Sequence, residues 1–476
     1  MIRFPKNLDP SRATHSSLVV PCPSGLQYDS YQIAGIEYAA QRRDTLIGDE
    51  PGLGKTIQAI GLANFLKCQR ILVICPSFLK PNWVKEFEKW KILPLEIDFV
   101  KDGKPAEFGH VVIINYELLE KHGEHIREIE WDLLIADEVH RLKNKRADRT
   151  RQVLGGIKRD GQKRIIARNS AIEAKHRIFL TGTPVLNGKP KELWPLLQSV
   201  DPAGLGSNWF EFAKRYCQLF EIKRFNPAKG REEHVGWKWD GADNLEELQE
   251  RMRLRFMVRR LKSEVMTQLP AKRRVVIPLE VSDRKLRKLL QTELQEFEEY
   301  AKGKAEDVYL EMPPFGDFAK RMQEIGLLMV PMTIEVIENE LESLPKLVVM
   351  CWHNEVARQI AEPFGDNCLL INEDVDPVDR FPLVEQFQTD PKIKLLVCTI
   401  GSASEGLTMT ASRVMIFPER AWTPGQVTQA EDRIHRRGQN EQCLFKHLVL
   451  EGSLSERQVR ILLTKQTNND RILDRS

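Results

Sequence analysis

The chain has 476 residues, a length that predicts roughly two to four domains. Hydrophobic residues make up 42% and charged residues 29%, as expected of a soluble globular protein. The formal net charge of +3 is too small to identify a nucleic-acid partner, so any such surface must come from local clusters of charge.

Cysteine spacing and hydropathy exclude several classes of protein. None of the eight cysteines forms a C-x-x-C pair, which favours buried reduced thiols over a disulfide framework or a zinc site. His122 and His125 have helical spacing, but no ligand cluster accompanies them, so no metal is expected there. The N-terminus lacks a signal-peptide core, and no run of about 18 apolar residues could span a membrane. We therefore expect a cytoplasmic protein.

The chain begins with residues 1–25, which are rich in Pro, Ser and charge and are expected to be a loosely held lead-in. A helix should follow, because Ile33, Ile36 and Ala40 recur at helical spacing. Gln32 and a neighbouring aromatic could enclose and recognise an adenine edge. An ordinary amphipathic helix is the alternative.

The stretch TLIGDEPGLGKTIQAI, residues 45–60, has the order strand, glycine-rich turn and helix that a phosphate-binding loop requires. Its glycines let backbone N–H groups approach phosphate oxygens, and the new helix adds its positive end. Lys55 would reach the β- and γ-phosphates, and Thr56 would hold Mg²⁺. Asp49 stands where the strict pattern has its first glycine, so a structural turn remains the alternative. The nucleotide ligands expected in this loop are Asp49, Gly52, Gly54, Lys55 and Thr56.

Short aliphatic runs follow the loop, and each is succeeded by polar or turn residues. Such runs suit strands buried on both faces of a parallel sheet. With helix-compatible segments between them, they predict a doubly wound α/β domain whose ligands bind at the carboxyl ends of the strands. The runs are residues 70–75, 111–115, 132–136 and 177–180.

Polar motifs stand at the ends of these runs. Asp137 and Glu138 follow a buried strand, where charge is costly unless an ion compensates it. Mg²⁺ would compensate Asp137, and Glu138 could orient or deprotonate an attacking water. Solvated loop charges are the alternative. The other residues singled out at these strand ends are Lys80, Trp83, His140, Thr181, Gly182 and Thr183.

The segment 141–177 is strongly basic, and either a solvated face or a phosphate-backbone contact would explain it. Residues 201–270 are expected to be a helical insertion, irregular at 223–239 and helical at 245–261. Apolar stripes at 286–297 and 334–344 then predict core-packed helices.

A second series of aliphatic runs predicts a second α/β domain, which has no glycine loop and is expected to complete a site. Gln429, Arg433 and Arg436 lie at i, i+4 and i+7, which would place them on one helix face. An arginine delivered from a second domain would neutralise charge on a γ-phosphate, whereas a salt-bridged surface helix is the alternative. The runs are residues 346–352, 394–399, 413–417 and 446–450.

The ordered set of motifs resembles the helicase motifs of the superfamily-two Swi/Snf-type ATPases. The motifs are GDEPGLGKT, ICPSFLKPNW, IINYELL, DEVH, LTGTPVLN and AWTPGQVTQAEDRIHRRGQ, and RRLKSEVMTQLPAKRR resembles the family's junction between two lobes. The resemblance runs from about Leu26 to the C-terminal helix. Within the family, the chain is most similar to the compact annealing-helicase (HepA-related) group, which remodels forked DNA.

The resemblance implies an α/β fold of two RecA-like doubly wound parallel-sheet lobes with helical insertions. ATP would bind in the cleft between the lobes with Mg²⁺, and duplex DNA would run across both. The implied domains are a lead-in (1–25), the first lobe (26–200), its helical insertion (201–270), a junction with the second lobe's helical insertion (271–345), the second lobe (346–452) and a C-terminal helix (453–476). A bare motor of this size resembles those of bacteria and their viruses.

The family's roles carry over to matching positions. The implied nucleotide and Mg²⁺ ligands are Gln32, Asp49, Gly52, Gly54, Lys55, Thr56, Asp137 and Gln429, with Glu138 activating water and Arg433 and Arg436 as arginine fingers. The implied coupling or DNA-contacting residues are Lys80, Trp83, His140, Thr181, Gly182, Thr183 and Trp422. Departures from the family pattern are Pro51 in place of Met, Val139 in place of a small residue and Arg437 in place of an apolar residue.

The leading hypothesis is an ATP- and Mg²⁺-dependent translocase on double-stranded DNA, with fork remodelling or strand annealing as its suggested task. Its contacts to duplex or forked DNA would go mostly to phosphates, so binding should be sequence-independent and salt-sensitive. No membrane partner is expected. The alternatives are a strand-separating DNA or RNA helicase and a nucleotide-gated DNA-binding clamp with little turnover.

Overall fold

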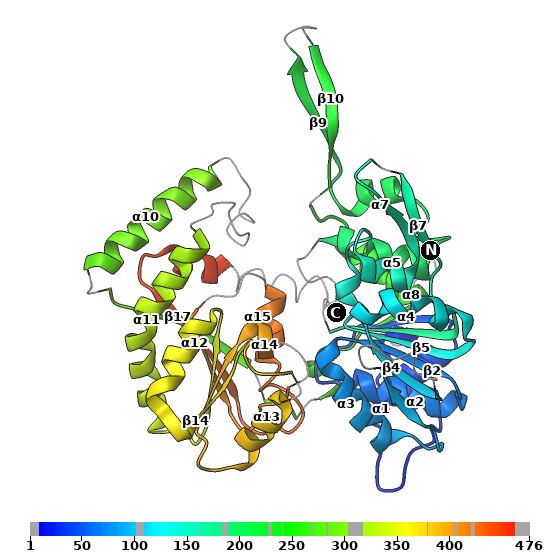
Figure 1. The fold of residues 1–476 in the computed structure, drawn as a ribbon, viewed down its shortest axis with the longest axis horizontal. Coiled ribbons are helices and arrows are strands. Elements are labelled where there is room, and N and C mark those ends of the chain that lie inside the picture. Colours follow the sequence, from blue (N-terminus) through cyan, green and yellow to red (C-terminus); the bar gives the residue numbers. More distant parts are fainter. Residues whose placement is uncertain are drawn as a thin grey trace. The chain divides into compact units, whose positions relative to one another are not determined.

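The computed structural model describes residues 9–100, 109–162, 164–182, 189–226, 231–239, 241–266, 268–270, 272–281, 284–302, 318–377, 379–403, 407–419 and 424–461. The chain divides into two compact units, and the second begins at Gln268. Each unit is built on one parallel sheet with helices packed against it (Figure 1).

The sheet of the first unit has seven strands in the order β11-β1-β8-β5-β2-β4-β3, all parallel. Its interior strands β2 and β4 are buried at every residue, as expected of mostly Val, Ile and Leu between two helical layers. The doubly wound parallel sheet is therefore confirmed. The strands are β1 (Asp44–Ile47), β2 (Ile71–Cys75), β3 (Ile97–Phe99), β4 (Val111–Asn115), β5 (Trp131–Asp137), β8 (Ala174–Leu180) and β11 (Met257–Val258).

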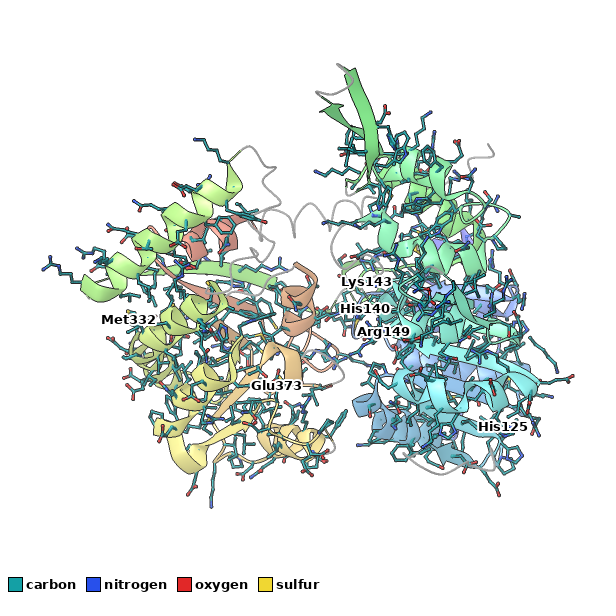
Figure 2. The ribbon with its side chains drawn as sticks, turned by 45° about the horizontal axis from the view of Figure 1, so that its top comes forward. His125, His140, Lys143, Arg149, Met332 and Glu373 are labelled. Carbon is teal, nitrogen blue, oxygen red and sulfur yellow. The ribbon has the colours of Figure 1, made fainter. Side chains whose placement is uncertain are left out.

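The helices of the first unit connect these strands or extend beyond them. His122 on α4 is buried, whereas His125 points outward at the surface (Figure 2) and lies 3.4 Å from Glu128. The helices are α1 (Ser30–Ala40), α2 (Lys55–Leu66), α3 (Lys80–Trp90), α4 (Leu119–Glu128), α5 (Asp148–Leu154), α6 (Trp194–Val200), α7 (Trp209–Tyr216), α8 (Leu245–Arg255) and α9 (Lys262–Val265), with 3-10 turns η2 (Pro10–Arg12), η3 (Ser77–Leu79), η4 (Tyr116–Leu118), η5 (Val139–Leu142) and η6 (Pro190–Leu193).

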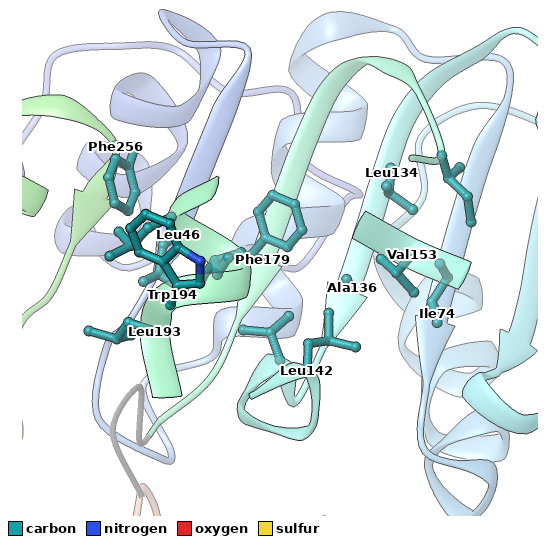
Figure 3. Packing of buried hydrophobic residues seen from close by; sticks show 14 of the residues in the cluster. Leu46, Ile74, Leu134, Ala136, Leu142, Val153, Phe179, Leu193, Trp194 and Phe256 are labelled. Atoms are coloured by element: carbon teal, nitrogen blue, oxygen red, sulfur yellow. The ribbon is translucent and has the colours of Figure 1, made fainter. Parts of the chain in front are cut away.

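Side chains alternate between the two faces of this sheet and build two cores. On one face, Leu46 of β1 and Phe179 of β8 pack with Trp194 of α6 (Figure 3). The next residues along the same strands, Ile47 and Leu180, belong to the core on the opposite face. Alternation of this kind follows from the two-residue period of a strand.

Two predictions for residues 201–270 are wrong. The described residues 223–226 and 231–238 are not irregular, because β9 (Phe220–Asn226) and β10 (Arg231–Lys238) form an antiparallel ribbon. Its alternation of apolar and charged residues around a Pro- and Gly-containing connection is a hairpin pattern. The helix expected over 245–261 ends at Arg255. Met257 and Val258 instead pair with β1 in the buried sheet, and this pairing stabilises them more than a continued helix would.

The basic segment 141–177 also contains an unexpected ribbon. β6 (Gly156–Arg159) and β7 (Ile165–Asn169) pair in antiparallel fashion. Three of its isoleucines are exposed, so this ribbon is not part of the sheet core. The exposed isoleucines are Ile157, Ile165 and Ile166.

The second unit has six parallel strands in the order β12-β17-β16-β13-β15-β14, which confirms the second α/β domain. Its strands are β12 (Lys272–Leu279), β13 (Leu347–Cys351), β14 (Cys368–Ile371), β15 (Leu395–Thr399), β16 (Val414–Phe417) and β17 (Cys443–Leu450). Its helices are α10 (Arg284–Ala301), α11 (Phe318–Leu341), α12 (Asn354–Ala361), α13 (Arg380–Thr389), α14 (Ile400–Ala403) and α15 (Pro424–Glu431), with the 3-10 turn η8 (Glu362–Asn367).

The apolar stripes of the second unit agree with expectation, and six of the cysteines are buried as expected, whereas Cys22 and Cys368 are only half-buried. Leu286 and Leu290 of α10 and Ile337 of α11 are buried in one core. All eight cysteines are free thiols. Among the described residues, no helix is long and apolar enough to cross a membrane, and no group of three or more His, Cys, Asp or Glu is arranged to hold a metal.

A buried histidine in the second unit gives a pH prediction. His447 of β17 stacks on Phe417 with ring centroids 4.7 Å apart. Burial lowers the pKa of His447 to about 4, although Glu431 raises it and Arg274 lowers it further. In the unfolded chain the pKa of His447 is about 6.5, so His447 binds a proton more readily there than in the folded unit. Stability from this group is present above pH 6.5 and is lost as the pH falls toward 4.

The expected loss of unfolding free energy is about 3 kcal/mol between pH 6.5 and 4. The His447→Phe variant should lose less stability than the wild type over this interval, as measured by urea unfolding followed at several pH values. Equal pH dependence in the two proteins would contradict the prediction.

Candidate active site

The glycine loop lies between β1 and α2, as the sequence predicts. Gly52 and Gly54 have φ of 89° and 70°, in the left-handed region that favours glycine. A Cβ atom on Gly54 would also lie only 2.4 Å from Nε2 of Gln32. The loop leads directly into the 12-residue helix α2, whose first N–H groups and dipole favour an anion.

Lys55 is the first residue of α2, and its ammonium group lies over the loop. Nζ donates to the carbonyl oxygens of Asp49 and Glu50, at 2.8 and 3.3 Å. Burial lowers the pKa of Lys55, and the carboxylates of Glu138, Asp49 and Asp137 oppose this shift. Phosphate oxygens can replace the two carbonyl acceptors, so the position suits a phosphate-binding lysine.

Asp137 ends β5 and lies beside Glu138. Its Oδ2 accepts a hydrogen bond from Nε1 of Trp83 at 3.0 Å, and its Oδ1 accepts one from the backbone N–H of Glu138 at 2.9 Å. Burial raises the pKa of Asp137, and the charge of Glu138 raises it further. A divalent cation would supply the missing positive charge, and Asp137 and Thr56 are hard oxygen ligands of the kind that Mg²⁺ prefers. These residues therefore fit Mg²⁺.

Glu138 begins the turn η5 with φ of 52°, a left-handed conformation that is uncommon for a residue with a side chain. Such conformations concentrate at functional sites. Its Oε2 lies 3.2 Å from Nδ1 of His140, and the same ring nitrogen lies 3.3 Å from Oγ1 of Thr181. His140 therefore connects the carboxylate after β5 to the hydroxyl after β8.

The residues around this connection are closely packed. Thr181 and Gly182 follow β8, and a Cβ atom on Gly182 would lie 2.5 Å from Cγ of Pro51 in the glycine loop. From the basic segment, Nε of Arg149 donates to the carbonyl of Arg141, next to His140 (Figure 2). The structure thus brings the three sequence motifs of the first unit together. Thr183 lies outside the described residues.

Gln32 and Asp49 are both buried beside the loop. Oε1 of Gln32 accepts the N–H of Asp29 at 2.9 Å, and its Nε2 donates to the carbonyl of Leu53 at 3.4 Å. The carboxylate of Asp49 instead faces the interior, where it forms a fully buried ion pair with Arg260 at 2.8 Å. Only the backbone of Asp49 is directed to Lys55.

Lys80 and Trp83 support the site from within the protein. Both lie on α3 and are buried. Nζ of Lys80 donates to the carbonyl of Val100 at 3.1 Å and to Oδ1 of Asn115 at 3.0 Å. Because both side chains are buried, this geometry does not support a direct DNA contact by either. Trp83 instead donates a hydrogen bond to Asp137.

In the second unit, the predicted helix face of Gln429, Arg433 and Arg436 is wrong. Helix α15 ends at Glu431, and the chain turns there. At this helix end Lys272 pairs with Asp432 and Arg274 pairs with Glu431. The guanidinium groups of Arg433 and Arg436 nevertheless converge on one carbonyl. Trp422 lies outside the described residues.

Arg433 and Arg436 both reach the carbonyl of Leu407, at 3.4 and 2.9 Å from Nη1. Arg433 also donates through Nε to the carbonyl of Gln429 at 2.9 Å, and Arg436 to Oγ1 of Thr408 at 2.7 Å. Burial lowers the pKa of Arg436 to about 10, and the neighbouring charge of Arg433 lowers it further. Arg436 therefore remains a cation at neutral pH.

Sequence reasoning missed Arg260 and Gln58. Nε2 of Gln58 donates to Oδ2 of Asp49 at 2.9 Å, and Arg260 contacts both carboxylate oxygens. The available signal was the position of Asp49, since a carboxylate in a buried glycine loop requires a cation.

A glycine loop, a strand-end Asp-Glu pair and a second α/β unit with clustered arginines define a helicase-type P-loop ATPase. The family model described as "SNF2-related domain" matches residues 31–312, and "Helicase conserved C-terminal domain" matches residues 332–438. The chain therefore belongs to the SNF2-related family of helicase-like ATPases.

The relatives that match most of this chain include two groups of proteins. Over 446 residues the chain is 32% identical to "DNA annealing helicase and endonuclease ZRANB3" of Bos taurus, covering 89% of this chain and 38% of that protein. It is 30% identical to the "SWI/SNF-related matrix-associated actin-dependent regulator of chromatin subfamily A-like protein 1" of Xenopus tropicalis, covering 90% of this chain and 43% of that protein. The chain thus spans about two fifths of these relatives.

A solved structure, "Sulfolobus solfataricus SWI2/SNF2 ATPase core in complex with dsDNA", is 21% identical and covers 93% of this chain and 92% of that chain, with a TM-score of 0.42. The fold assignment rests on the two parallel sheets described above.

Proposed function

We propose that the chain is an ATP- and Mg²⁺-dependent motor that translocates along double-stranded DNA and remodels it. The observation that carries this proposal is the grouping of Lys55, Asp137 and Glu138 at the carboxyl end of the first sheet, with Glu138 linked through His140 to Thr181. Relatives named as annealing helicases support fork remodelling or strand annealing as the task.

Each residue then has a defined role. The N–H groups of the loop and Lys55 bind the β- and γ-phosphates, and Thr56 and Asp137 would hold Mg²⁺, which offsets the phosphate charge. Glu138 orients the attacking water and accepts its proton. Arg433 and Arg436 neutralise charge that develops on the γ-phosphate, and Gln32 and Gln429 contribute to nucleotide binding.

The contacts of His140 with Glu138 and Thr181 would couple ATP hydrolysis to DNA binding. A change in the charge of Glu138 alters the electrostatic environment of His140 and hence its interaction with Thr181. The Thr181-Gly182 turn would pass this change to DNA phosphates. Because such contacts go to the backbone, binding should weaken steeply with salt and vary little with sequence.

The test is steady-state ATP hydrolysis with Mg²⁺, compared without nucleic acid and with single-stranded DNA, duplex DNA, forked DNA and RNA. Duplex or forked DNA should stimulate turnover strongly, and Glu138→Gln should abolish the stimulated rate while retaining ATP binding. Stimulation by single strands or RNA alone would contradict the duplex motor. ATP binding without turnover on any substrate would indicate a nucleotide-gated clamp.

A strand-separating helicase is the second candidate, and the β9–β10 ribbon favours it. This ribbon pairs with no other described strand, and Phe220 and Trp237 on it are exposed. Exposed aromatics can stack on unpaired bases. Unwinding of a forked duplex with a trap strand separates the two candidates, because a translocase without strand separation would hydrolyse ATP and release no single strand.

A further inference from the structure

The segment that follows α8 in the first unit runs alongside the glycine loop. β11 pairs in parallel with β1, with Leu46 opposite Met257 and Ile47 opposite Val258. The pairing continues beyond the strand into the loop. Three alternate N–H groups donate to this segment: Leu46 to the carbonyl of Phe256 at 2.7 Å, Gly48 to that of Val258 at 2.8 Å, and Glu50 to that of Arg260 at 3.1 Å. We call residues 256–262 the loop strap.

Arg260, in the loop strap, contacts three elements of the nucleotide site. Its Nε and Nη2 donate to Oδ1 and Oδ2 of Asp49, at 3.1 and 2.8 Å, and its backbone N–H donates to Oδ1 at 2.9 Å. Nη2 also donates to Oε1 of Gln58 on α2 at 2.9 Å. Nη1 donates to the carbonyl of Tyr31 on α1, the residue before Gln32.

The surroundings of Arg260 are fitted to its guanidinium group. Arg260 and Asp49 are both fully buried. A Cβ atom on Gly35 would lie 2.5 Å from Nη2 of Arg260 and 2.1 Å from Oε1 of Gln58, so the helix α1 leaves room for this group only because residue 35 is glycine. Burying the charge of Arg260 or of Asp49 alone would cost free energy, whereas in the ion pair each charge is compensated by the other.

The neighbouring Arg259 connects the loop strap to the second motif of the site. Its Nη1 donates to the carbonyl of Gly48 at 2.6 Å and to that of Gly182 at 3.2 Å. The backbone at the start of the glycine loop and the backbone after Thr181 therefore share one donor. The chain enters the second unit at Gln268, only six residues beyond the loop strap.

We propose that Arg260 is a positioning residue for the nucleotide, and that it acts through Asp49. It holds the glycine loop to α1 and α2, so that the N–H groups and Lys55 face the phosphates while Gln32 faces the base. This inference rests on the proposed ATP site. Binding by backbone N–H groups depends on their geometry, and a displacement of about 1 Å in such a site typically costs about 10²-fold in activity.

The experiment compares the wild-type chain with Arg260→Gln, Asp49→Asn and the double variant. Arg255→Gln is the matched control, because Arg255 belongs to the same arginine-rich segment but is exposed and pairs at 2.7 Å with Asp201, away from the loop. The measurements are the Kd for a fluorescent ATP analogue with Mg²⁺, the Kd for duplex DNA without nucleotide, and the melting temperature.

Each single variant should weaken nucleotide binding by about tenfold or more. DNA binding without nucleotide should remain unchanged, and the double variant should bind nucleotide no worse than the weaker single variant, because the pair acts as a unit. Arg255→Gln should behave as wild type in all three measurements. A lower melting temperature with wild-type nucleotide binding would show a structural role alone and would overturn the proposal.

Two further outcomes are informative. If Arg260→Gln does not fold, Arg260→Lys, which keeps the charge, and Asp49→Asn decide the question by the same criterion. If wild type and Arg255→Gln bind no nucleotide, the proposed ATP site fails and this inference fails with it. If Arg260→Gln folds and binds nucleotide as tightly as the wild type does, this inference is overturned but the proposed ATP site is not.

Discussion

Replacing Lys55 with alanine is expected to lower ATP turnover at least about 100-fold, the effect typical of removing one charge-stabilising donor. The ammonium group of Lys55 lies over the loop carbonyls of Asp49 and Glu50, at the start of α2. It is the cation of the loop best placed to meet phosphate oxygens. Its loss leaves the backbone N–H groups to balance the phosphate charge alone, so ATP binding should weaken as well.

The control is Lys67→Ala, at the opposite end of the same helix, where the side chain is exposed. This variant should hydrolyse ATP at the wild-type rate. Turnover is measured with saturating duplex DNA, and binding with a fluorescent ATP analogue. Equal turnover by Lys55→Ala and wild type would show that the glycine loop is only a structural turn.

The fully buried strands of both sheets are largely predictable, because each of them is a contiguous aliphatic run. β2 and β4 are examples, since neither face of the strand meets water and no polar residue is required. β3 and β14 are not predicted, because they have only three and four residues, most of them half-buried or exposed, and therefore carry little pattern. For the same reason the sequence predicts helix at β11, a two-residue strand that follows an arginine-rich helix.

The residues of the nucleotide site were predictable where a local motif contains them, as with Lys55 and the Asp137-Glu138 pair. The residues that hold these site residues in place were not predictable, because their contacts join parts of the chain that are distant in sequence. Arg260 and Asp49 are 211 positions apart, and no local pattern identifies one as the partner of the other. Physical reasoning from the sequence reaches only the need for a cation beside the buried Asp49.

The arginines of the second unit show a different limit. Their spacing fits one helix face, and the convergence of Arg433 and Arg436 on Leu407 is real, but a turn and not a helix produces it. Spacing of four and three residues also arises in consecutive turns, where side chains can meet through the fold. Gly438, with φ of 98°, continues this turn, and its left-handed conformation excludes a regular helix at that point.

Arg436→Ala is the second substitution with a large expected effect. If Arg436 neutralises the γ-phosphate, its removal should lower the turnover number by about 10³-fold or more, as is usual for an arginine finger. ATP binding should change little, because the charge develops only in the transition state. Arg436→Lys should recover little of the loss, since an ammonium group cannot reproduce the planar fork of donors.

Arg437→Ala is the matched control, because the next residue carries the same charge but is exposed. Its turnover should equal that of the wild type. The contacts of Arg436 to Leu407 and Thr408 also support the chain locally, so the melting temperature of each variant must be measured. A folded Arg436→Ala with near-normal turnover would exclude Arg436 as the finger. Arg433, which reaches the same carbonyl, would then be the remaining candidate, and the Arg433→Ala variant would be expected to show the loss instead.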